Sequence, residues 1–133
     1  MVVDAAVVVD ASAVVDLLVN GRPLPRERAL VAPGHMDAEV LSALGRLHRQ
    51  EVLTVADVEE MLDDLAALAI ERLSVSALLR PAFALRANVA LRDALYVSLA
   101  QALGATLCTT DAPLARACVE QQLCAVTGGG RGR

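Results

Sequence analysis

The sequence predicts an α/β fold, a three-layer α/β/α sandwich with a central, mainly parallel sheet of four to five strands. Short, continuous apolar runs such as residues 5–9 have the pattern of strands buried on both faces of a parallel sheet. These runs alternate with amphipathic segments of helical period, as expected where helices cover both faces of a sheet. The 133 residues contain no internal repeat or linker, so we expect one domain over residues 1–127 and a flexible, basic tail over 128–133.

The first half of the chain is expected to contain two strands and two helices before residue 50. The first strand covers residues 7–9, and Ser12 caps a helix that runs through about residue 18 and ends at Asn20-Gly21. Residues 23–33 form a loop that leads into a short strand at 30–32, and a helix follows over 36–49. The inner stripe of that helix consists of Val40, Leu44 and Leu47.

A capping box at residues 54–57 opens the next helix. Its apolar stripe consists of Val58, Met61, Leu62, Leu65, Leu68 and Ala69. Five acids fall outside the stripe, namely Asp57, Glu59, Glu60, Asp63 and Asp64. This helix is therefore expected to carry much of the acidic charge of the chain.

The second half of the chain continues the alternation of strands and helices. A third strand covers residues 70–75, a helix interrupted near Pro81 covers 76–88, and a longer helix covers 91–103. The longer helix is expected to end at Gly104 and to bury Leu91, Leu95, Leu99, Ala102 and Leu103. A strand at 106–110, a helix at 113–123 and a final strand at 124–127 complete the domain.

The composition excludes several classes of protein. No apolar run approaches the roughly 18 residues of a membrane span, and no basic region precedes the first run, so we expect a cytoplasmic protein without membrane or signal segments. Three cysteines without C-x-x-C spacing, and a loop His35 far from a helix-surface His48, disfavour disulfides and zinc. The absence of lysine excludes Schiff-base and P-loop chemistry. By itself, the net charge of −4 argues against a nucleic-acid-binding protein.

Four acidic residues are predicted to lie at the carboxyl edge of the sheet, where ligands bind in open parallel sheets. Asp10 and Asp111 directly follow strands, and Glu39 and Asp93 fall in the first turns of helices. Taken singly, each acid is explained as a turn former or by the helix dipole. Taken together they would repel one another unless protons or a cation neutralised them.

Oxygen ligands without Cys or His select hard cations, so these four acids predict a Mg²⁺ or Mn²⁺ site. Such a site is suited to metal-activated attack of water on a phosphodiester. Asp4 and Asp16 are rival acids. Asp4 precedes the first strand and Asp16 lies inside the first helix, so we expect both to have structural or supporting roles.

Four motifs, in this order and spacing, resemble those of PIN-domain ribonucleases. They are Val-Val-Asp-Ala-Ser-Ala-Val-Val-Asp-Leu-Leu at 8–18, Ala-Glu-Val-Leu-Ser-Ala-Leu at 38–44, Arg-Asp-Ala-Leu-Tyr-Val-Ser-Leu-Ala at 92–100 and Leu-Cys-Thr-Thr-Asp at 107–111. The resemblance covers roughly residues 7–126. The short length and the stretch Ala-Leu-Gly-Ala-Thr-Leu at 102–107 make the chain most similar to VapC-type toxins of bacterial type II toxin–antitoxin systems.

This resemblance implies a PIN-like sandwich and a Mg²⁺- or Mn²⁺-dependent endoribonuclease that leaves a 5′-phosphate and a 3′-hydroxyl. The implied metal ligands are Asp10, Glu39, Asp93 and Asp111, and the implied positioning hydroxyls are those of Ser12 and Thr109. The implied substrate is an RNA (tRNA, rRNA or mRNA), and the implied partners are a second copy in a homodimer and a cognate antitoxin whose tail blocks the site. Arg92 departs from the family, which often has Tyr there, and this difference bears on access to the site or on substrate contacts.

Two other classes of α/β protein do not fit the sequence. A receiver domain needs a lysine that the chain lacks, and a haloacid-dehalogenase-type phosphatase needs an acid where Ser12 stands. Two alternatives stay open: a housekeeping PIN-domain RNA-processing nuclease without an antitoxin, and a catalytically weak PIN-fold module that binds RNA or protein. Without the four site acids and the five helix acids, seven acids face 12 arginines, so the net charge does not exclude RNA after all.

Overall fold

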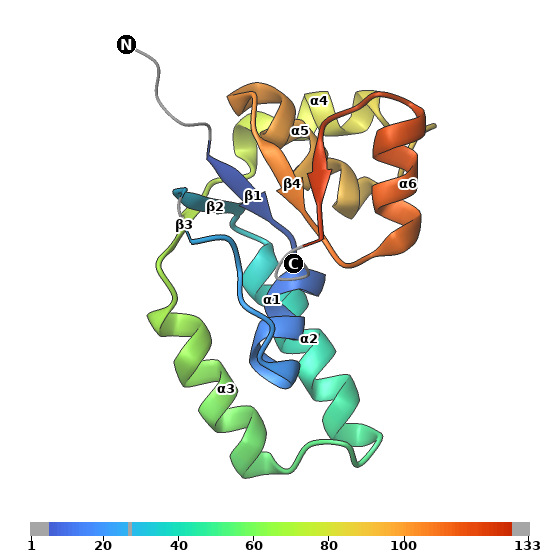
Figure 1. Ribbon diagram of the computed structural model, residues 1–133. Helices are drawn as coiled ribbons and strands as arrows, with labels where there is room; N and C mark the ends of the chain where they lie inside the picture. The colour runs from blue at the N-terminus through green and yellow to red at the C-terminus, as the bar shows by residue number, and fades with distance from the viewer. Residues whose placement is uncertain (1–5, 27, 129–133) are drawn as a thin grey trace.

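The computed structural model describes residues 6–26 and 28–128, in which five strands form one parallel sheet between layers of helices (Figure 1). The strands are β1 (Val7–Val9), β2 (Leu30–Pro33), β3 (Ile70–Leu73), β4 (Thr106–Cys108) and β5 (Val126–Thr127). Their order in the sheet is β3-β2-β1-β4-β5, and every pair of neighbours is parallel. This confirms the predicted α/β/α sandwich and its parallel sheet.

Each of the first four strands is followed by one or more helices. They are α1 (Ala11–Asn20), α2 (Met36–Arg49), α3 (Val55–Ala67), the short 3₁₀ helix η1 (Ser76–Leu78), α4 (Leu79–Ala84), α5 (Leu91–Leu103) and α6 (Ala112–Glu120). Helix α5 packs against β1, β2 and β4, and α6 packs against β5. Helices α1, α2 and α3 pack on one another and extend away from the sheet in the lower half of Figure 1.

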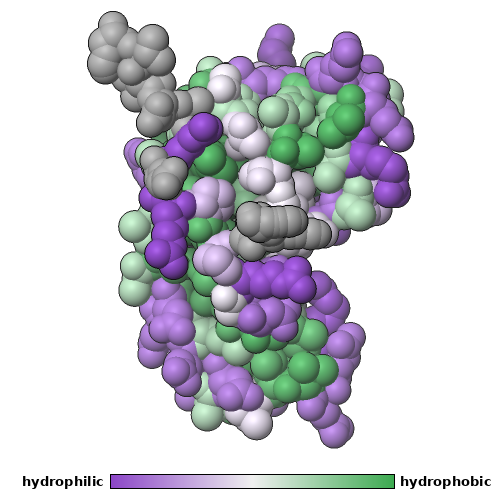
Figure 2. Space-filling view, in the orientation of Figure 1, coloured by the Kyte–Doolittle hydropathy of each residue, from purple (hydrophilic) through white to green (hydrophobic). Residues whose placement is uncertain are grey.

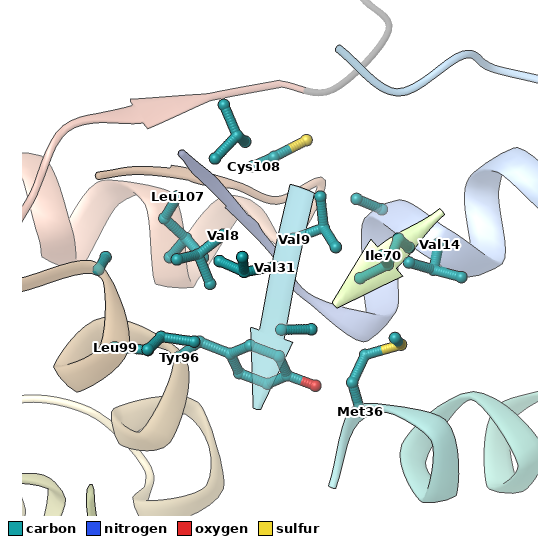
Figure 3. Close-up of a cluster of buried hydrophobic side chains, with 14 of the residues drawn as sticks. Val8, Val9, Val14, Val31, Met36, Ile70, Tyr96, Leu99, Leu107 and Cys108 are labelled. Carbon is teal, nitrogen blue, oxygen red and sulfur yellow. The ribbon is translucent and has the colours of Figure 1, made fainter. Parts of the chain in front are cut away.

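The core is built around the central strands (Figure 3). Val8 and Val9 of β1 and Leu107 of β4 are completely buried. Tyr96 of α5 lies beneath these strands and is the one buried aromatic side chain among the described residues. Aliphatic side chains fill nearly all of the remaining interior, so the Tyr96 hydroxyl is a rare polar group inside the core.

Several elements end earlier than the sequence predicts. The strands expected at 70–75 and 106–110 are β3 and β4, which end at Leu73 and Cys108. The strand expected at 124–127 is β5, which is shorter because it begins only at Val126. The segment expected as one helix over 76–88 is η1 followed by α4, which ends at Ala84 and carries Pro81 in its first turn, where no backbone N–H is needed. The last helix begins at Ala112 because Asp111 caps it, and it ends before Gln122, whose φ is +53°.

The helix caps are confirmed with one exception. Gly21 and Gly104 end α1 and α5 with φ values of +74° and +62°, and Thr54 and Asp57 form the predicted capping box. The prediction that Ser12 caps the first helix is wrong. Asp10 is the N-cap, because its carboxylate accepts the orphan backbone N–H of Ala13, and α1 therefore begins one residue before Ser12.

The predicted buried face of α5 is wrong at three of its five residues. Leu91 is 51% exposed, Leu103 is 44% exposed and Ala102 is exposed. Leu99 is buried as predicted and Leu95 is partly buried against the core, and the other buried side chains of the helix are those of Ala94, Tyr96, Val97, Ser98 and Ala100. Helix α5 lies between the sheet and α4, so most of its circumference is covered and no single apolar stripe marks its inner side.

Helices α2 and α3 agree better with their predicted stripes. Val40 and Leu44 are fully buried and Leu47 is half-buried. In α3, Leu65 is buried, and Val58, Met61 and Leu62 pack partly buried against the core. Leu68 and Ala69 follow the end of the helix, where Leu68 is partly buried and Ala69 is exposed. Four of the acids outside this stripe, Glu59, Glu60, Asp63 and Asp64, are exposed, and the surface over α3 in Figure 2 is mainly hydrophilic.

None of the three cysteines forms a disulfide, and burial raises the pKa of Cys118 to about 12. Cys108 and Cys118 are buried and Cys124 is half-buried. Among the helices that the structure describes, none is long and apolar enough to cross a membrane. Residues 129–133 of the predicted basic tail lie outside the described residues.

Arg72 of β3 joins three elements through its guanidinium group. It donates to both carboxylate oxygens of Asp37 in α2, at 3.0 to 3.3 Å, and to the carbonyl oxygens of Leu65, Leu68 and Ile70. Two of these carbonyls belong to the last turn of α3 and the residue after it, where helix carbonyls lack intrahelical partners. The guanidinium therefore fixes the end of α3 to the sheet edge and to the start of α2.

Replacing Arg72 should destabilise the fold measurably. We expect Arg72→Ala to lower the free energy of unfolding by about 2–3 kcal/mol, because several half-buried acceptors lose their donor at once. Urea denaturation followed by circular dichroism measures this change. Arg80→Ala removes an exposed arginine from α4 and should change stability by less than about 0.5 kcal/mol. Equal effects of the two substitutions would contradict this role of Arg72.

Candidate active site

Asp10 lies at the carboxyl end of β1 and is only 4% exposed. Its Oδ1 accepts hydrogen bonds from the Ser12 hydroxyl at 2.7 Å and the Ala13 backbone N–H at 3.0 Å, and its Oδ2 accepts one from the Thr109 hydroxyl at 2.5 Å. Burial raises the pKa of Asp10, although these three hydrogen bonds oppose the rise. The carboxylate is thus held in one orientation, with about one of its four acceptor positions left for another ligand.

The hydroxyls of Ser12 and Thr109 connect Asp10 to the segment that follows β4. Ser12 Oγ accepts from the backbone N–H of Thr110 at 2.9 Å, and Thr109 Oγ1 accepts from the backbone N–H of Asp111 at 3.0 Å. The two hydroxyl oxygens are 3.2 Å apart, and each donates its proton to Asp10. Both side chains therefore orient the Asp10 carboxylate and fix the backbone that carries Asp111.

Glu39, in the first turn of α2, is held by three side chains. The Tyr96 hydroxyl donates to Glu39 Oε1 at 2.6 Å, and His35 Nε2 lies 3.8 Å from the same oxygen. The Arg92 guanidinium is 3.6 Å from Oε2. His35 also packs against the Tyr96 ring, with 4.7 Å between the ring centroids. Glu39 is therefore oriented from α5 and from the residue that precedes α2.

Asp93 and Asp111 complete the acidic group. Asp93 lies in the first turn of α5, and Asp111 is the N-cap of α6, where its Oδ1 accepts from the Leu114 backbone N–H at 3.1 Å. Burial raises the pKa of Asp93, and the negative charges of Asp111, Glu39 and Asp10 raise it further, while Arg92 lowers it. The four predicted acids thus lie close enough to influence one another's ionisation.

All four acids line one open cavity of about 730 Å³. The other lining residues come mainly from α1, α2 and α5: Ala11, Ser12, Val15, Asp16, Val19, Asn20, His35, Ala38, Ser42, Ala43, Arg46, Leu47, Arg92, Tyr96 and Thr110. Asp16, one of the rival acids, therefore also reaches the cavity, but its carboxylate is engaged by Asn20 at 2.7 Å and by Arg22 at 3.6 Å. Asp4 lies outside the described residues.

The four carboxylates offer oxygen donors, which fit a hard cation. In residues 6–26 and 28–128, no three His, Cys, Asp or Glu side chains are grouped tightly enough to form a ready-made metal site. However, the carboxylates around the cavity raise the pKa of Asp93, so a cation there would relieve their repulsion. Mg²⁺ binds through one or two carboxylates and keeps several waters. The donor set, all oxygen, agrees with that chemistry.

Sequence reasoning missed two residues of this site. Tyr96 occurs in one of the quoted motifs, but its contact with Glu39 spans 57 positions of the chain and leaves no local signal. His35 lies in the turn before α2, as expected of a loop histidine, but its half-buried contacts with Tyr96 and Glu39, with Nε2 3.1 Å from the Arg92 carbonyl oxygen, were not predicted. Arg92, noted as a departure from the family, proves to be an ion-pair partner of Glu39.

Comparison with known proteins identifies the class to which this fold and site belong. The family model of the PIN domain matches residues 7–120. The chain therefore belongs to the PIN-domain family. A solved structure, PAE2754 from Pyrobaculum aerophilum, has the same fold with a TM-score of 0.65, at 23% identity over 90% of this chain and 87% of that one.

Curated relatives narrow the class to VapC-type PIN ribonucleases. Ribonuclease VapC3 of Mycobacterium tuberculosis is 48% identical over 118 residues, which are 84% of this chain and 86% of the relative. Ribonuclease VapC1 of the same species is 40% identical over 83% of this chain and 89% of its own length. Ribonuclease VapC9 is 38% identical over 79% of this chain and 85% of its own length. This is the family that the four sequence motifs indicate.

Proposed function

We propose that the protein is the toxin of a toxin–antitoxin pair, an endoribonuclease that hydrolyses RNA phosphodiesters with the aid of Mg²⁺ or Mn²⁺. The observation that carries this proposal is the convergence of four carboxylates on one cavity at the carboxyl edge of a PIN-domain sheet. The VapC ribonucleases to which the chain is similar support the ribonuclease activity and the toxin class. Divalent metal use is a property of this family.

Asp10, Glu39, Asp93 and Asp111 are the residues that we propose to hold the cation. When bound, a divalent cation lowers the pKa of water and stabilises the charge that develops on the phosphodiester. The protein contributes orientation. Asp10 is fixed by the hydroxyls of Ser12 and Thr109, and Glu39 is fixed by Tyr96.

The finer properties of the proposed enzyme follow from the same family. It acts in the cytoplasm on tRNA, rRNA or mRNA and leaves a 5′-phosphate and a 3′-hydroxyl. Its proposed partners are a second copy in a homodimer and a cognate antitoxin whose tail blocks the cavity. A molar mass in solution of twice 13.9 kDa supports the homodimer, and the monomer mass overturns it.

Expression in a bacterial host tests the toxin function. We expect the wild-type chain to stop growth within a few generations, because cleaved tRNA, rRNA or mRNA no longer supports translation, and we expect co-expression of the cognate antitoxin to restore growth. Colony counts after induction measure the effect. The Asp93→Asn variant, expressed to the same level, is the matched control and should be harmless.

Each alternative function gives a different outcome in this experiment. A harmless wild-type protein that cleaves RNA in vitro would support a housekeeping nuclease and overturn the toxin function. A harmless wild-type protein without metal-dependent cleavage would overturn the nuclease as well, in favour of a binding module.

A further inference from the structure

The cavity that contains the four acids continues as a groove between α1 and α2. Val15 and Val19 of α1 form one wall, and Ala43 and Leu47 of α2 form the other. Their side chains make the groove largely apolar beyond the acids, and Asn20 adds an amide. In the view of Figure 2, a hydrophobic area lies in the lower half of the molecule, over α1 and α2 of Figure 1.

One face of α2 carries both the acidic and the basic end of the groove. Glu39, Ser42, Ala43 and Arg46 line the cavity, with the spacing of residues on the same side of a helix. Arg46 is seven residues after Glu39, which is about 10 Å along the helix axis at 1.5 Å per residue. The groove thus begins at a group of carboxylates and reaches a guanidinium about two helical turns away.

The Arg46 guanidinium has no ionic partner among the residues that the structure describes. The arginines that form ion pairs there are Arg22 with Asp16, Arg72 with Asp37 and Arg92 with Glu39. Arg46 is exposed and free to bind a ligand, although it lines a cavity that also contains several acids. An unpaired guanidinium in such a place is suited to an anion that the carboxylates do not supply.

We propose that the groove between α1 and α2 is the path of single-stranded RNA and that Arg46 binds a phosphate within three nucleotides of the cleaved bond. This inference rests on the proposed function, because it places the cleaved phosphodiester at the four acids. About 10 Å corresponds to three nucleotides at the stacked spacing of 3.4 Å and to fewer in an extended strand. A neighbouring phosphate therefore lies within reach of Arg46 whenever a strand follows the groove.

The apolar walls favour a single strand over a duplex. Val15, Val19 and Leu47 offer contact surface to unstacked bases, which a duplex keeps in its interior. Arg46 contacts a phosphate of the RNA backbone, so it adds affinity without selecting a base. An acidic peptide could pair with Arg46 but gives no reason for the anion to lie at a fixed distance from the acids.

Direct binding tests the inference without requiring cleavage. The probe is a fluorescein-labelled, mixed-sequence RNA of 12 nucleotides, and its anisotropy is measured with the full chain in EDTA at several salt concentrations. For Arg46→Gln we expect the Kd at low salt to rise about 5- to 20-fold, and the slope of log K against log salt to fall in magnitude by about 0.7, the value for one phosphate contact on a single strand. Arg46→Lys should recover part of the affinity because it keeps the charge.

Arg49 provides a matched control. It is exposed on the same helix, one turn beyond Arg46, and does not line the cavity. Arg49→Gln removes the same charge and should change Kd less than twofold. Circular dichroism should show the same Tm for both variants, since both side chains are exposed.

The outcomes separate this inference from the proposed function. If Arg46→Gln binds RNA as tightly as Arg49→Gln does, the groove is not the RNA path. A loss of binding to a protein inhibitor in the same variant would not change that conclusion. If the wild-type protein loses RNA affinity through Arg46 but cleaves no RNA with Mg²⁺ or Mn²⁺, the inference stands and the proposed nuclease function fails. Equal affinity for a duplex of the same sequence overturns the single-strand preference.

Discussion

Asp93→Asn should reduce metal-dependent RNA cleavage by at least about a thousandfold while leaving the fold intact. The substitution keeps the shape of the side chain but removes the negative charge of one of the four predicted site acids. Burial and the neighbouring acids raise the pKa of Asp93, so its carboxylate is disfavoured in the protein without a cation. We therefore expect the variant to be at least as stable as the wild type in EDTA, with a Tm equal to it or a few degrees higher.

This combination of lost activity and retained stability distinguishes a functional acid from a structural one. Asp10 should behave differently, because it is also the N-cap of α1: Asp10→Asn should lower both activity and stability, since an asparagine side chain cannot accept the same three hydrogen bonds. Asp64→Asn removes an exposed acid from α3 and is the matched control, with unchanged activity expected. Cleavage by purified Asp93→Asn at the wild-type rate would remove Asp93 from the site.

The sequence predicts the position of the four acids because two local rules coincide there. Asp10 and Asp111 follow buried strands, and Glu39 and Asp93 open helices, so a parallel sheet delivers all four to one edge. The bounds of α2 and α5 are also those predicted, since Gly104 and the periodicity of residues 36–49 are strong local signals. Such features depend on the few residues nearest to them.

The features that were missed depend on contacts between distant segments. Tyr96 meets Glu39 only because α5 passes beneath the sheet next to the start of α2. The buried face of α5 was wrong for the same reason: Ala94 and Ser98 are small, and their burial follows from the close approach of α4 and the sheet, not from hydrophobicity. Ser12 was mistaken for the N-cap because serine and aspartate are both favoured at that position. In the structure, Asp10 accepts the backbone N–H that an N-cap satisfies.

Removing divalent cations should abolish cleavage and reverse the pH dependence of stability. Folding raises the pKa of both Asp10 and Asp93 above the ordinary value of 3.8, mainly through burial. The folded protein therefore binds more protons than the unfolded chain in the pH range between the unfolded and folded values, and its stability falls as pH rises through that range. Without a cation, these two groups should make the protein less stable above that range than below 3.8, the ordinary pKa of an aspartate.

A cation binds the deprotonated carboxylates, so its stabilising effect should grow as pH rises. At a Mn²⁺ concentration 100 times the dissociation constant, the expected gain is about 2.7 kcal/mol at pH 7.5. For a domain of this size, that gain corresponds to a Tm increase on the order of 10 °C, and the increase should shrink as pH falls through the range in which the two carboxylates gain protons. Differential scanning fluorimetry with and without Mn²⁺ across this pH range measures both trends.

The same titration in Asp93→Asn separates binding at the acids from nonspecific effects of the ion. If the cation is held by the four acids, the variant should lose most of the Mn²⁺-dependent rise in Tm, whereas Asp64→Asn should keep it. A rise in Tm that is independent of pH, or equal in both variants, would place the ion elsewhere on the protein. Burial and the neighbouring charges disfavour the ionised carboxylates of Asp10 and Asp93, and a bound cation favours them, so the metal requirement and the pH dependence involve the same groups.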